Sequence, residues 1–209
     1  MPGERGIITS GSMEAVVTVP MILATAYLLG SIPASYAVAF IWTGGRNIHH
    51  IGDGNPGVMN VWDNIGLAPA LLAAAGDIGK GTAAVGLAYW VSDSHMLAIF
   101  AGLAAVIGHD YSVFLRFKGG NGTATTVGAW LALIPLATLA AALLTTILFV
   151  VTRRKRFSGF VGLNSAPFLA FAFGYPHELT VGIVVMLVLL AAKIFSFEGF
   201  TPARSRVKR

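Results

Sequence analysis

The stretch that decides the fold runs from Gly108 to Thr126 and reads G-H-D-Y-S-V-F-L-R-F-K-G-G-N-G-T-A-T-T. It ends one apolar run and begins the next, and between the runs lie two cations and three glycines: Arg116, Lys118, Gly119, Gly120 and Gly122. Glycines let a ligand approach the backbone N–H groups, and a helix that starts near Thr123 would direct its positive end to the same place. The pattern predicts a phosphate cradle. The alternative interpretation is a polar connector between two membrane helices.

The composition is that of an integral membrane protein. Of 209 residues, 56% are hydrophobic and only 11% are charged, with a mean hydropathy of +0.75, whereas a soluble domain carries about 25% charged residues. The net charge is +5, and the basic residues lie between or beyond the apolar runs. This placement favours a role in membrane orientation and in contacts to anionic lipids over binding of nucleic acid. The chain has no cysteine, and its histidines lack acidic partners at ligand spacing, so we expect no metal and no cofactor.

The apolar runs predict an all-α protein with about seven transmembrane helices. The charge-free run 123–152 is flanked by basic residues on both sides, so we expect it to cross twice and to turn near Pro135. Pro33 should kink the first helix and free a carbonyl group, to which Ser31 could donate a hydrogen bond. The expected spans are 15–42, 66–91, 96–115, two within 123–152, 159–174 and 180–197.

The distribution of Lys and Arg predicts the orientation, with the N-terminus outside and the C-terminus in the cytoplasm. The turns at 92–95, near 135 and at 175–179 hold no Lys or Arg, whereas the opposite loops hold Arg46, Arg116, Lys118, Arg153, Arg154, Lys155 and Arg156. This topology brings the polar loops 43–65 and 116–122 to the same cytoplasmic face. We expect a disordered extracytoplasmic tail (1–14), one membrane domain (15–198) and a basic cytoplasmic tail (199–209).

The second expected span carries an acid and a base near its middle. Asp77 and Lys80 are three residues apart, so they share a helix face and can pair. An ionisable pair at this depth marks a functional site, and the alternative is a structural ion pair that locks two helices.

Four motifs together resemble the bacterial membrane glycerol-3-phosphate acyltransferases that use acyl phosphate, the PlsY family. They are L-L-G-S-I-P at 28–33, G-D-G-N-P-G-V-M-N at 52–60, D-I-G-K-G at 77–81 and the long stretch from Gly108 to Thr125. The resemblance implies a multi-pass protein of the bacterial plasma membrane with a cytoplasmic active face. Its reaction would move an acyl group from acyl phosphate to the 1-hydroxyl of glycerol 3-phosphate, giving lysophosphatidic acid for phospholipid synthesis.

The resemblance also implies roles for residues of this chain. Asn55 and Asn60 would orient the glycerol or the second phosphate, His109 would hydrogen-bond the loop or act as a base, and Asp77 and Lys80 would brace the second span. The expected phosphate-binding residues are Lys118, Gly119, Gly120, Gly122, Thr125, Arg116 and Arg46.

Several positions differ from the pattern of the resembled family. Asp53 replaces a serine, Asp63 an arginine, Asn121 a lysine, Ser112 a proline and Gly162 a serine. Two alternatives follow from these changes. One is a catalytically inactive paralogue that binds lipid or regulates a partner acyltransferase. The other is an acyltransferase whose new aspartates recognise a hydroxyl-rich or cationic acceptor.

Overall fold

The computed structural model describes residues 10–200, with side chains for 17–196, and within that range it contains helices and loops but no strand. The α-helices are α1 (Ser10–Ser31), α2 (Ala34–Trp42), α3 (Val58–Asn64), α4 (Leu67–Val91), α5 (His95–Asp110), α6 (Thr123–Leu133), α7 (Pro135–Thr152), α8 (Lys155–Ala172) and α9 (His177–Phe200). Two short 3₁₀ turns, η1 (Ile48–His50) and η2 (Val113–Leu115), lie in the loops. The predicted tails fall mostly outside the described residues, although α1 already begins at Ser10.

The long helices follow the apolar runs of the sequence. Four segments in the described part of the chain are long and apolar enough to cross a membrane: Val17–Trp42, His95–Leu115, Pro135–Thr152 and His177–Ser196. A further apolar helix, α6, is shorter, and the chain breaks at Ile134 before Pro135 starts α7. The predicted turn near Pro135 is therefore present, because proline is well suited to the first position of a helix.

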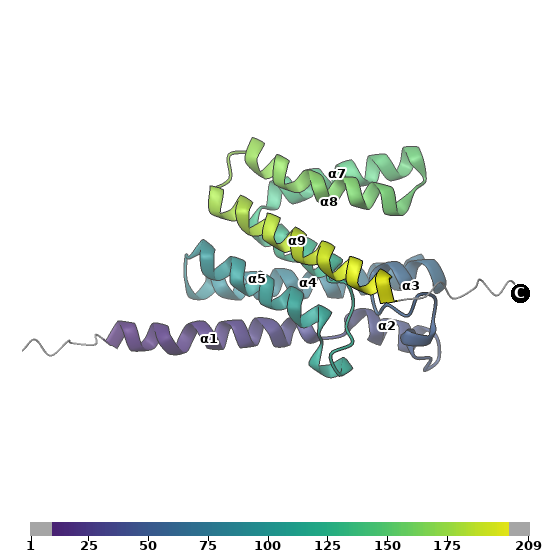
Figure 1. The fold of residues 1–209 in the computed structure, drawn as a ribbon, viewed down its shortest axis with the longest axis horizontal. Helices are drawn as coiled ribbons and strands as arrows, with labels where there is room; N and C mark the ends of the chain where they lie inside the picture. The colour runs from purple at the N-terminus through teal and green to yellow at the C-terminus, as the bar shows by residue number, and fades with distance from the viewer. Residues whose placement is uncertain (1–9, 201–209) are drawn as a thin grey trace, which may run out of the picture.

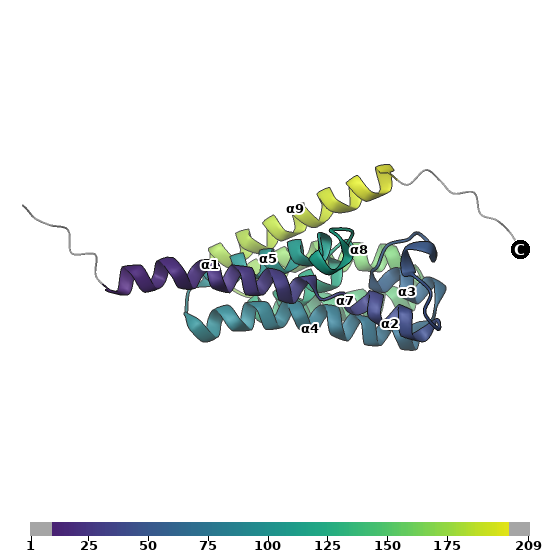
Figure 2. The same cartoon turned by 90° about the horizontal axis from the view of Figure 1, so that it is seen from below.

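The helices run roughly along one axis and place polar loops at one end (Figure 1). The start of α1 and the turns α4–α5 and α8–α9 lie at one end, and α2, α3, the α7–α8 turn and the end of α9 lie at the other. Figure 2 shows α9 crossing the bundle obliquely, whereas α1 and α4 follow its length. The main packing pairs are α1 with α5, α4 with α6, and α7 with α8.

Glycines permit the two closest helix crossings. A side-chain carbon added at Gly30 of α1 would lie 2.0 Å from the carbonyl oxygen of Ala105 on α5, and one at Gly128 of α6 would lie 2.0 Å from that of Ile78 on α4. Small residues let membrane helices approach to backbone contact. These crossings hold α1 against α5 and α6 against α4, and the polar cavity described below is lined by residues of α4, α5 and α6.

A small apolar cluster fastens the first polar loop to the bundle. Ile48 of η1 and Val61 of α3 are fully buried, and they belong to a cluster with alanines of α2 and α4. Burying apolar side chains stabilises a loop that has few regular hydrogen bonds of its own. The loop 43–57 is thus held against the end of the bundle where the candidate site lies.

Candidate active site

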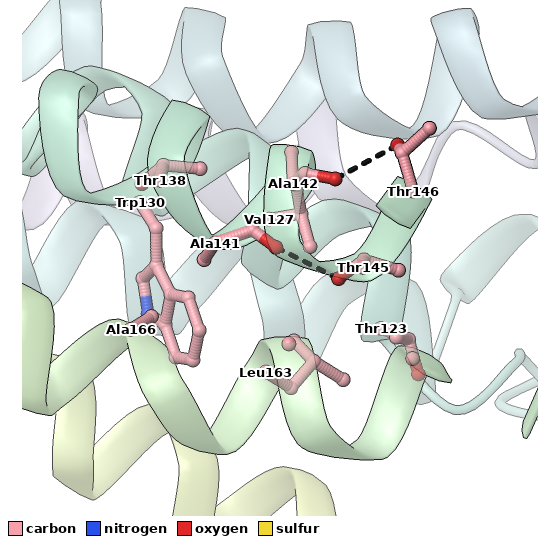
Figure 3. A pocket seen from close by; sticks show the side chains of 12 residues that line it. Thr123, Val127, Trp130, Thr138, Ala141, Ala142, Thr145, Thr146, Leu163 and Ala166 are labelled. Carbon is pink, nitrogen blue, oxygen red and sulfur yellow. Dashed lines mark hydrogen bonds between the residues drawn. The ribbon is translucent and has the colours of Figure 1, made fainter. Parts of the chain in front are cut away.

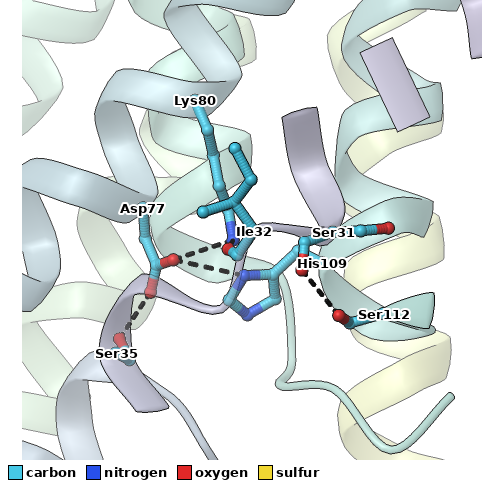
Figure 4. A network of polar contacts seen from close by, with 7 residues as sticks. All are labelled: Ser31, Ile32, Ser35, Asp77, Lys80, His109 and Ser112. Carbon is cyan, nitrogen blue, oxygen red and sulfur yellow. Dashed lines mark hydrogen bonds and ion pairs between the residues drawn. The ribbon is translucent and has the colours of Figure 1, made fainter. Parts of the chain in front are cut away.

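A polar network forms where the first long helix is broken (Figure 4). Helix α1 ends before Pro33, and the carbonyl oxygen of Ile32 accepts a hydrogen bond from Lys80 Nζ at 2.8 Å. The carbonyl oxygen of Ser31 accepts one from Ser112 Oγ at 2.6 Å. The kink predicted at Pro33 is therefore a complete break, and side chains of other segments satisfy the carbonyl groups that it frees, as a break in an apolar environment requires.

Asp77 is the centre of this network. Its Oδ2 accepts a hydrogen bond from Ser35 Oγ at 2.5 Å, and its Oδ1 lies 2.8 Å from Lys80 Nζ and 3.5 Å from His109 Nδ1. The predicted pair of Asp77 and Lys80 forms, with both residues buried. A buried charge needs such partners because its desolvation is costly. The network joins α2, α4 and α5 at one point.

A cavity of about 320 Å³ opens beside the network, among the 55–59 segment, α4, α5 and the start of α6. Much of its wall is apolar, and we call it the polar cavity after the polar side chains that it holds. Its polar lining consists of Asn55, Asp77, His109, Asn121 and Thr123. Within the described residues, no three His, Asp or Glu side chains gather as a metal site would require. The cavity is open to an organic ligand with polar groups.

The glycine loop folds back onto the end of α5. The amides of Gly119 and Gly120 donate to the carbonyl oxygens of Asp110 and His109, both at 3.2 Å. A side-chain carbon at Gly119 would lie 1.9 Å from the oxygen of His109, and one at Gly120 would lie 2.4 Å from His109 Nε2. Both amides therefore have partners within the chain, and the phosphate contact expected of them stays a prediction. Glycines are needed here because the loop packs against backbone at Gly119 and against the His109 side chain at Gly120.

The N-terminus of α6 faces the cavity. Asn121, Thr123 and Ala124 line the cavity wall, and Gly122 precedes the helix with a φ of 71° and no capping side chain. The first N–H groups of a helix lack intrahelical partners and carry partial positive charge. A carboxylate oxygen of Asp110 lies close by, 2.6 Å from a side-chain carbon built at Gly122. Asp110 was not among the site residues predicted from the sequence.

The three predicted cations lie outside this cavity. Arg46, Arg116 and Lys118 are exposed, and none of them contributes to the cavity wall. Arg116 takes a left-handed conformation, with a φ of 52°, where η2 ends. The structure does not bring these side chains together with the polar residues of the wall.

The two asparagines predicted for the site, Asn55 and Asn60, differ in whether their side-chain amides are free to bind a ligand. Asn60 donates both amide hydrogens, to the carbonyl oxygens of Ile51 and Asn55 at 2.9 Å each, and its Oδ1 accepts from Asn64 at 2.8 Å. It therefore holds the loop, and its role in orienting substrate stays a prediction. Asn55 lines the cavity, and its buried Oδ1 has no hydrogen-bond partner among the described residues.

Two other predicted residues are closed off from ligands. Thr125 is fully buried where α4 crosses α6, and its carbonyl oxygen lies 2.2 Å from a side-chain carbon built at Gly81. Thr125 does not line the polar cavity, and its contact with a phosphate stays a prediction. Ser31 is also fully buried, and its hydroxyl has no partner among the described residues. The hydroxyl that binds a freed carbonyl group belongs to Ser112 instead.

The two aspartates that depart from the resembled family have local partners. Asp53 Oδ1 accepts the backbone N–H of Asn55 at 3.0 Å, a turn that serine also forms. Asp63 pairs with Lys155, whose Nζ lies 4.3 Å from the centre of the Trp62 ring. Both carboxylates therefore take part in holding the loop and α3 in place, and neither lines the polar cavity.

Lys193 of α9 contacts the end of α5, and the sequence contains no signal that predicts this contact. Its Nζ donates to the carbonyl oxygen of Asp110 at 3.3 Å and lies 3.9 Å from the centre of the Tyr111 ring. A cation at the C-terminal end of a helix is favourable. No sequence signal could indicate this contact, because α9 meets the end of α5 only in the folded chain.

The fold and the site define a class of protein: an apolar helical bundle that carries a buried polar network and a polar cavity near one end. The family to which it belongs follows from sequence. Residues 20–198 match the profile of the family described as glycerol-3-phosphate acyltransferase. The chain belongs to this family.

Relatives and solved structures agree with that assignment. The chain is 34% identical to glycerol-3-phosphate acyltransferase 2 of Dehalococcoides mccartyi, over 85% of this chain and 83% of that protein. It is 42% identical to glycerol-3-phosphate acyltransferase of Synechococcus sp., over 72% and 73%. The crystal structures of PlsY, an integral membrane glycerol 3-phosphate acyltransferase, in its glycerol 3-phosphate and lysophosphatidic acid forms, each superpose with a TM-score of 0.76. Their identity is 30%, over 87% of this chain and 90% of theirs.

Proposed function

We propose that this protein transfers a fatty acyl group from an acyl phosphate to the 1-hydroxyl of glycerol 3-phosphate, giving lysophosphatidic acid. One observation carries the proposal. The polar cavity and an apolar groove of about 320 Å³ between α6, α7 and α8 share Thr123 and Val127 in their walls (Figure 3). The wall of the polar cavity carries the ionisable side chains of Asp77 and His109 and two asparagine amides, whereas the groove wall carries no ionisable or amide side chain. A site of this kind next to such a groove suits a substrate with a phosphate at one end and a hydrocarbon chain at the other.

The groove is apolar although threonines line it. Thr138, Thr145 and Thr146 each donate their hydroxyl hydrogen to the carbonyl oxygen four residues earlier in the chain, at 3.0, 2.8 and 2.8 Å. Their hydroxyl groups are thereby satisfied within the helix. The remaining wall consists mainly of alanine, glycine, valine, leucine and tryptophan side chains. This lining supports the assignment of the groove to the acyl chain.

The chemistry requires one hydroxyl group to attack one carbonyl carbon. The bond from that carbon to the phosphate oxygen breaks, the electron pair leaves with inorganic phosphate, and the hydroxyl proton must be taken up. Of the titratable groups on the cavity wall, Asp77 is already engaged by Ser35 and Lys80, which leaves His109 as the base. Asp77 lies 3.5 Å from His109 Nδ1 and holds the ring orientation.

The anionic groups are served by two features of the same end of the bundle. The N-terminus of α6 offers backbone N–H groups to a phosphate, and Asn55 offers a buried amide to the glycerol. Arg46, Arg116 and Lys118 stay exposed and draw phosphates toward the cavity mouth by long-range attraction. These roles replace the tighter phosphate cradle of the sequence-based prediction.

The proposal includes the orientation of the chain in the bacterial plasma membrane. We propose seven membrane crossings, with the start of α1 outside and the loops that carry the basic residues in the cytoplasm. Within the described part, the turns at 92–94 and 173–176 hold no Lys or Arg, whereas the turn at 153–154 consists of two arginines. The cavity would then open toward cytoplasmic glycerol 3-phosphate.

Acyl transfer by the purified protein tests the function. Given acyl phosphate and glycerol 3-phosphate, the protein should form lysophosphatidic acid and release phosphate in equal amounts. His109→Gln should lower kcat by about 100-fold or more, because a positioned base contributes at least that much. Lys118→Ala should lower kcat/KM in low salt and lower it less in high salt. The matched control is Arg154→Ala, which removes an exposed cation from another loop at the same end of the bundle and should change kcat/KM less than Lys118→Ala does.

Three outcomes would contradict the proposal or parts of it. Phosphate release without lysophosphatidic acid would indicate another acceptor. A folded protein that binds acyl phosphate but turns nothing over would indicate a regulatory role. Full activity in His109→Gln would reject the base and leave the reaction itself in place.

A further inference from the structure

Trp130 lies at one end of the apolar groove. Figure 3 shows Thr123, where the groove meets the polar cavity, at one end and Trp130 at the other. Both residues lie on α6, and seven residues of helix correspond to a depth of about 10 Å. Trp130 is 1% exposed and is the largest of the fully buried side chains in the described residues.

Trp130 differs in size from the rest of the groove wall. Much of the lining is small, including Ala141, Ala142, Gly159, Gly162 and Ala166. These residues leave room for a chain along the groove, whereas the indole ring fills the space at its end. Ala166 of α8 lies beside the ring (Figure 3) and is itself buried, so the protein covers the ring on that side.

We propose that Trp130 sets the maximum length of the acyl chain that this protein accepts. This inference rests on the proposed function, because it assigns the groove to the acyl chain of the substrate. A chain whose end reaches the ring fills the groove. A longer chain must displace the ring or leave the groove, because a close-packed wall yields to extra methylenes only at a cost in free energy.

The chain-length profile of the enzyme tests this proposal directly. The kcat/KM of the wild type should rise with the length of the acyl phosphate and then fall by about 10-fold or more once the chain exceeds the groove, the usual selectivity of an apolar pocket for a methylene. Trp130→Leu should move that fall to longer chains. Ala166→Val, which adds bulk beside the ring, should move it to shorter chains.

The matched control is Trp90→Leu, the same substitution at a side chain that is 85% exposed on α4 and does not line the groove. This variant should keep the wild-type profile. An unchanged profile in an active Trp130→Leu variant would overturn the proposal and leave the acyltransferase function intact. An equal shift in Trp90→Leu would also overturn it.

A binding measurement separates this proposal from the reaction. In a variant with Trp42, Trp62 and Trp90 replaced by phenylalanine, Trp130 is the one remaining indole of the chain. Acyl phosphates brominated at successive carbons should quench its fluorescence most when the bromine is at the chain end. Such a gradient supports the groove assignment even if turnover is absent, and quenching that is independent of bromine position would refute it.

Discussion

Ser112 supports the broken first helix from outside that helix. It lies just after α5, and its hydroxyl donates to the carbonyl oxygen of Ser31 at 2.6 Å while its side chain is almost fully buried. Ser112→Ala should therefore destabilise the protein by about 1–3 kcal/mol, the cost of leaving a buried acceptor unpaired. The thermal unfolding midpoint in detergent measures this loss.

The control for that substitution is Ser196→Ala on α9. Its hydroxyl also donates to a backbone carbonyl oxygen, that of Ala192, but the side chain is exposed. Exposed positions of this kind change stability by at most about 0.5 kcal/mol. Equal midpoints for the two variants would show that the bond from Ser112 does not stabilise the break.

Lys80 connects the same break to Asp77. Its Nζ bonds the carbonyl oxygen of Ile32 and pairs with Asp77, both at 2.8 Å. Lys80→Met should cost about 3–5 kcal/mol, because it leaves a buried carboxylate without its cation. The double variant Asp77→Asn, Lys80→Met removes both charges and should recover part of the loss. The fraction of folded protein after graded heating measures the stability of the single and the double variant. A double variant no more stable than Lys80→Met would contradict the view that the unpaired carboxylate causes the loss.

At the residue scale, the sequence predicted contacts that are local along a helix and missed those that depend on tertiary structure. The pair of Asp77 and Lys80 follows from a spacing of three residues. The use of the Asn60 amide within its own loop, and of the Gly119 and Gly120 amides by the end of α5, depends on how each loop folds back. Motif spacing does not contain that information, so these groups were predicted to be free for ligands.

At the scale of elements, α7 and α8 pack closely through Gly162. A side-chain carbon at this position would lie 1.7 Å from Thr145 Oγ1. Gly162→Ala should therefore destabilise the α7–α8 pair by about 1–3 kcal/mol, the usual cost of overpacking. Adding Thr145→Ala removes the obstructing hydroxyl and should restore much of the stability, although it also removes the bond to Ala141.

Gly159→Ala is the matched control for the packing of α7 on α8. It lies one turn earlier on the same helix, and a side-chain carbon there would meet nothing within 4 Å. Since alanine favours the helix over glycine by about 1 kcal/mol, this variant should be as stable as the wild type or more so. The thermal unfolding midpoints of the wild type and the three variants, measured in one detergent, test this packing. A Gly162→Ala protein as stable as Gly159→Ala would refute close packing at this position.

The elements themselves were predictable where hydrophobicity alone decides them. The long helices follow apolar runs, and the prolines at 33 and 135 mark the interruptions. The helix α3 and the turns η1 and η2 were not predicted, because they lie in polar segments without apolar periodicity. Burial of Ile48 and Val61 against the bundle and the hydrogen bonds of Asn60 hold η1 and α3 in place.

At the scale of the whole molecule, chemistry is concentrated at one end of the bundle. The loop 43–57, the glycine loop and the N-terminus of α6 meet there, and the apolar groove extends from it along α6. Such an arrangement lets a hydrocarbon chain stay in the lipid while the phosphates remain near water. The orientation of this end therefore decides which compartment supplies the glycerol 3-phosphate.

Single cysteines can determine that orientation, because the chain contains none of its own. Asp93 in the α4–α5 turn and Arg154 in the α7–α8 turn are both exposed and lie at opposite ends of the bundle. In intact cells, a membrane-impermeant thiol reagent should label the Asp93→Cys variant and leave Arg154→Cys unlabelled, because basic loops stay in the cytoplasm. After the cells are opened, both variants should react, which controls for the reactivity of each thiol. The reverse pattern in intact cells would place the polar cavity outside the cell. The acyl acceptor would then have to come from that compartment.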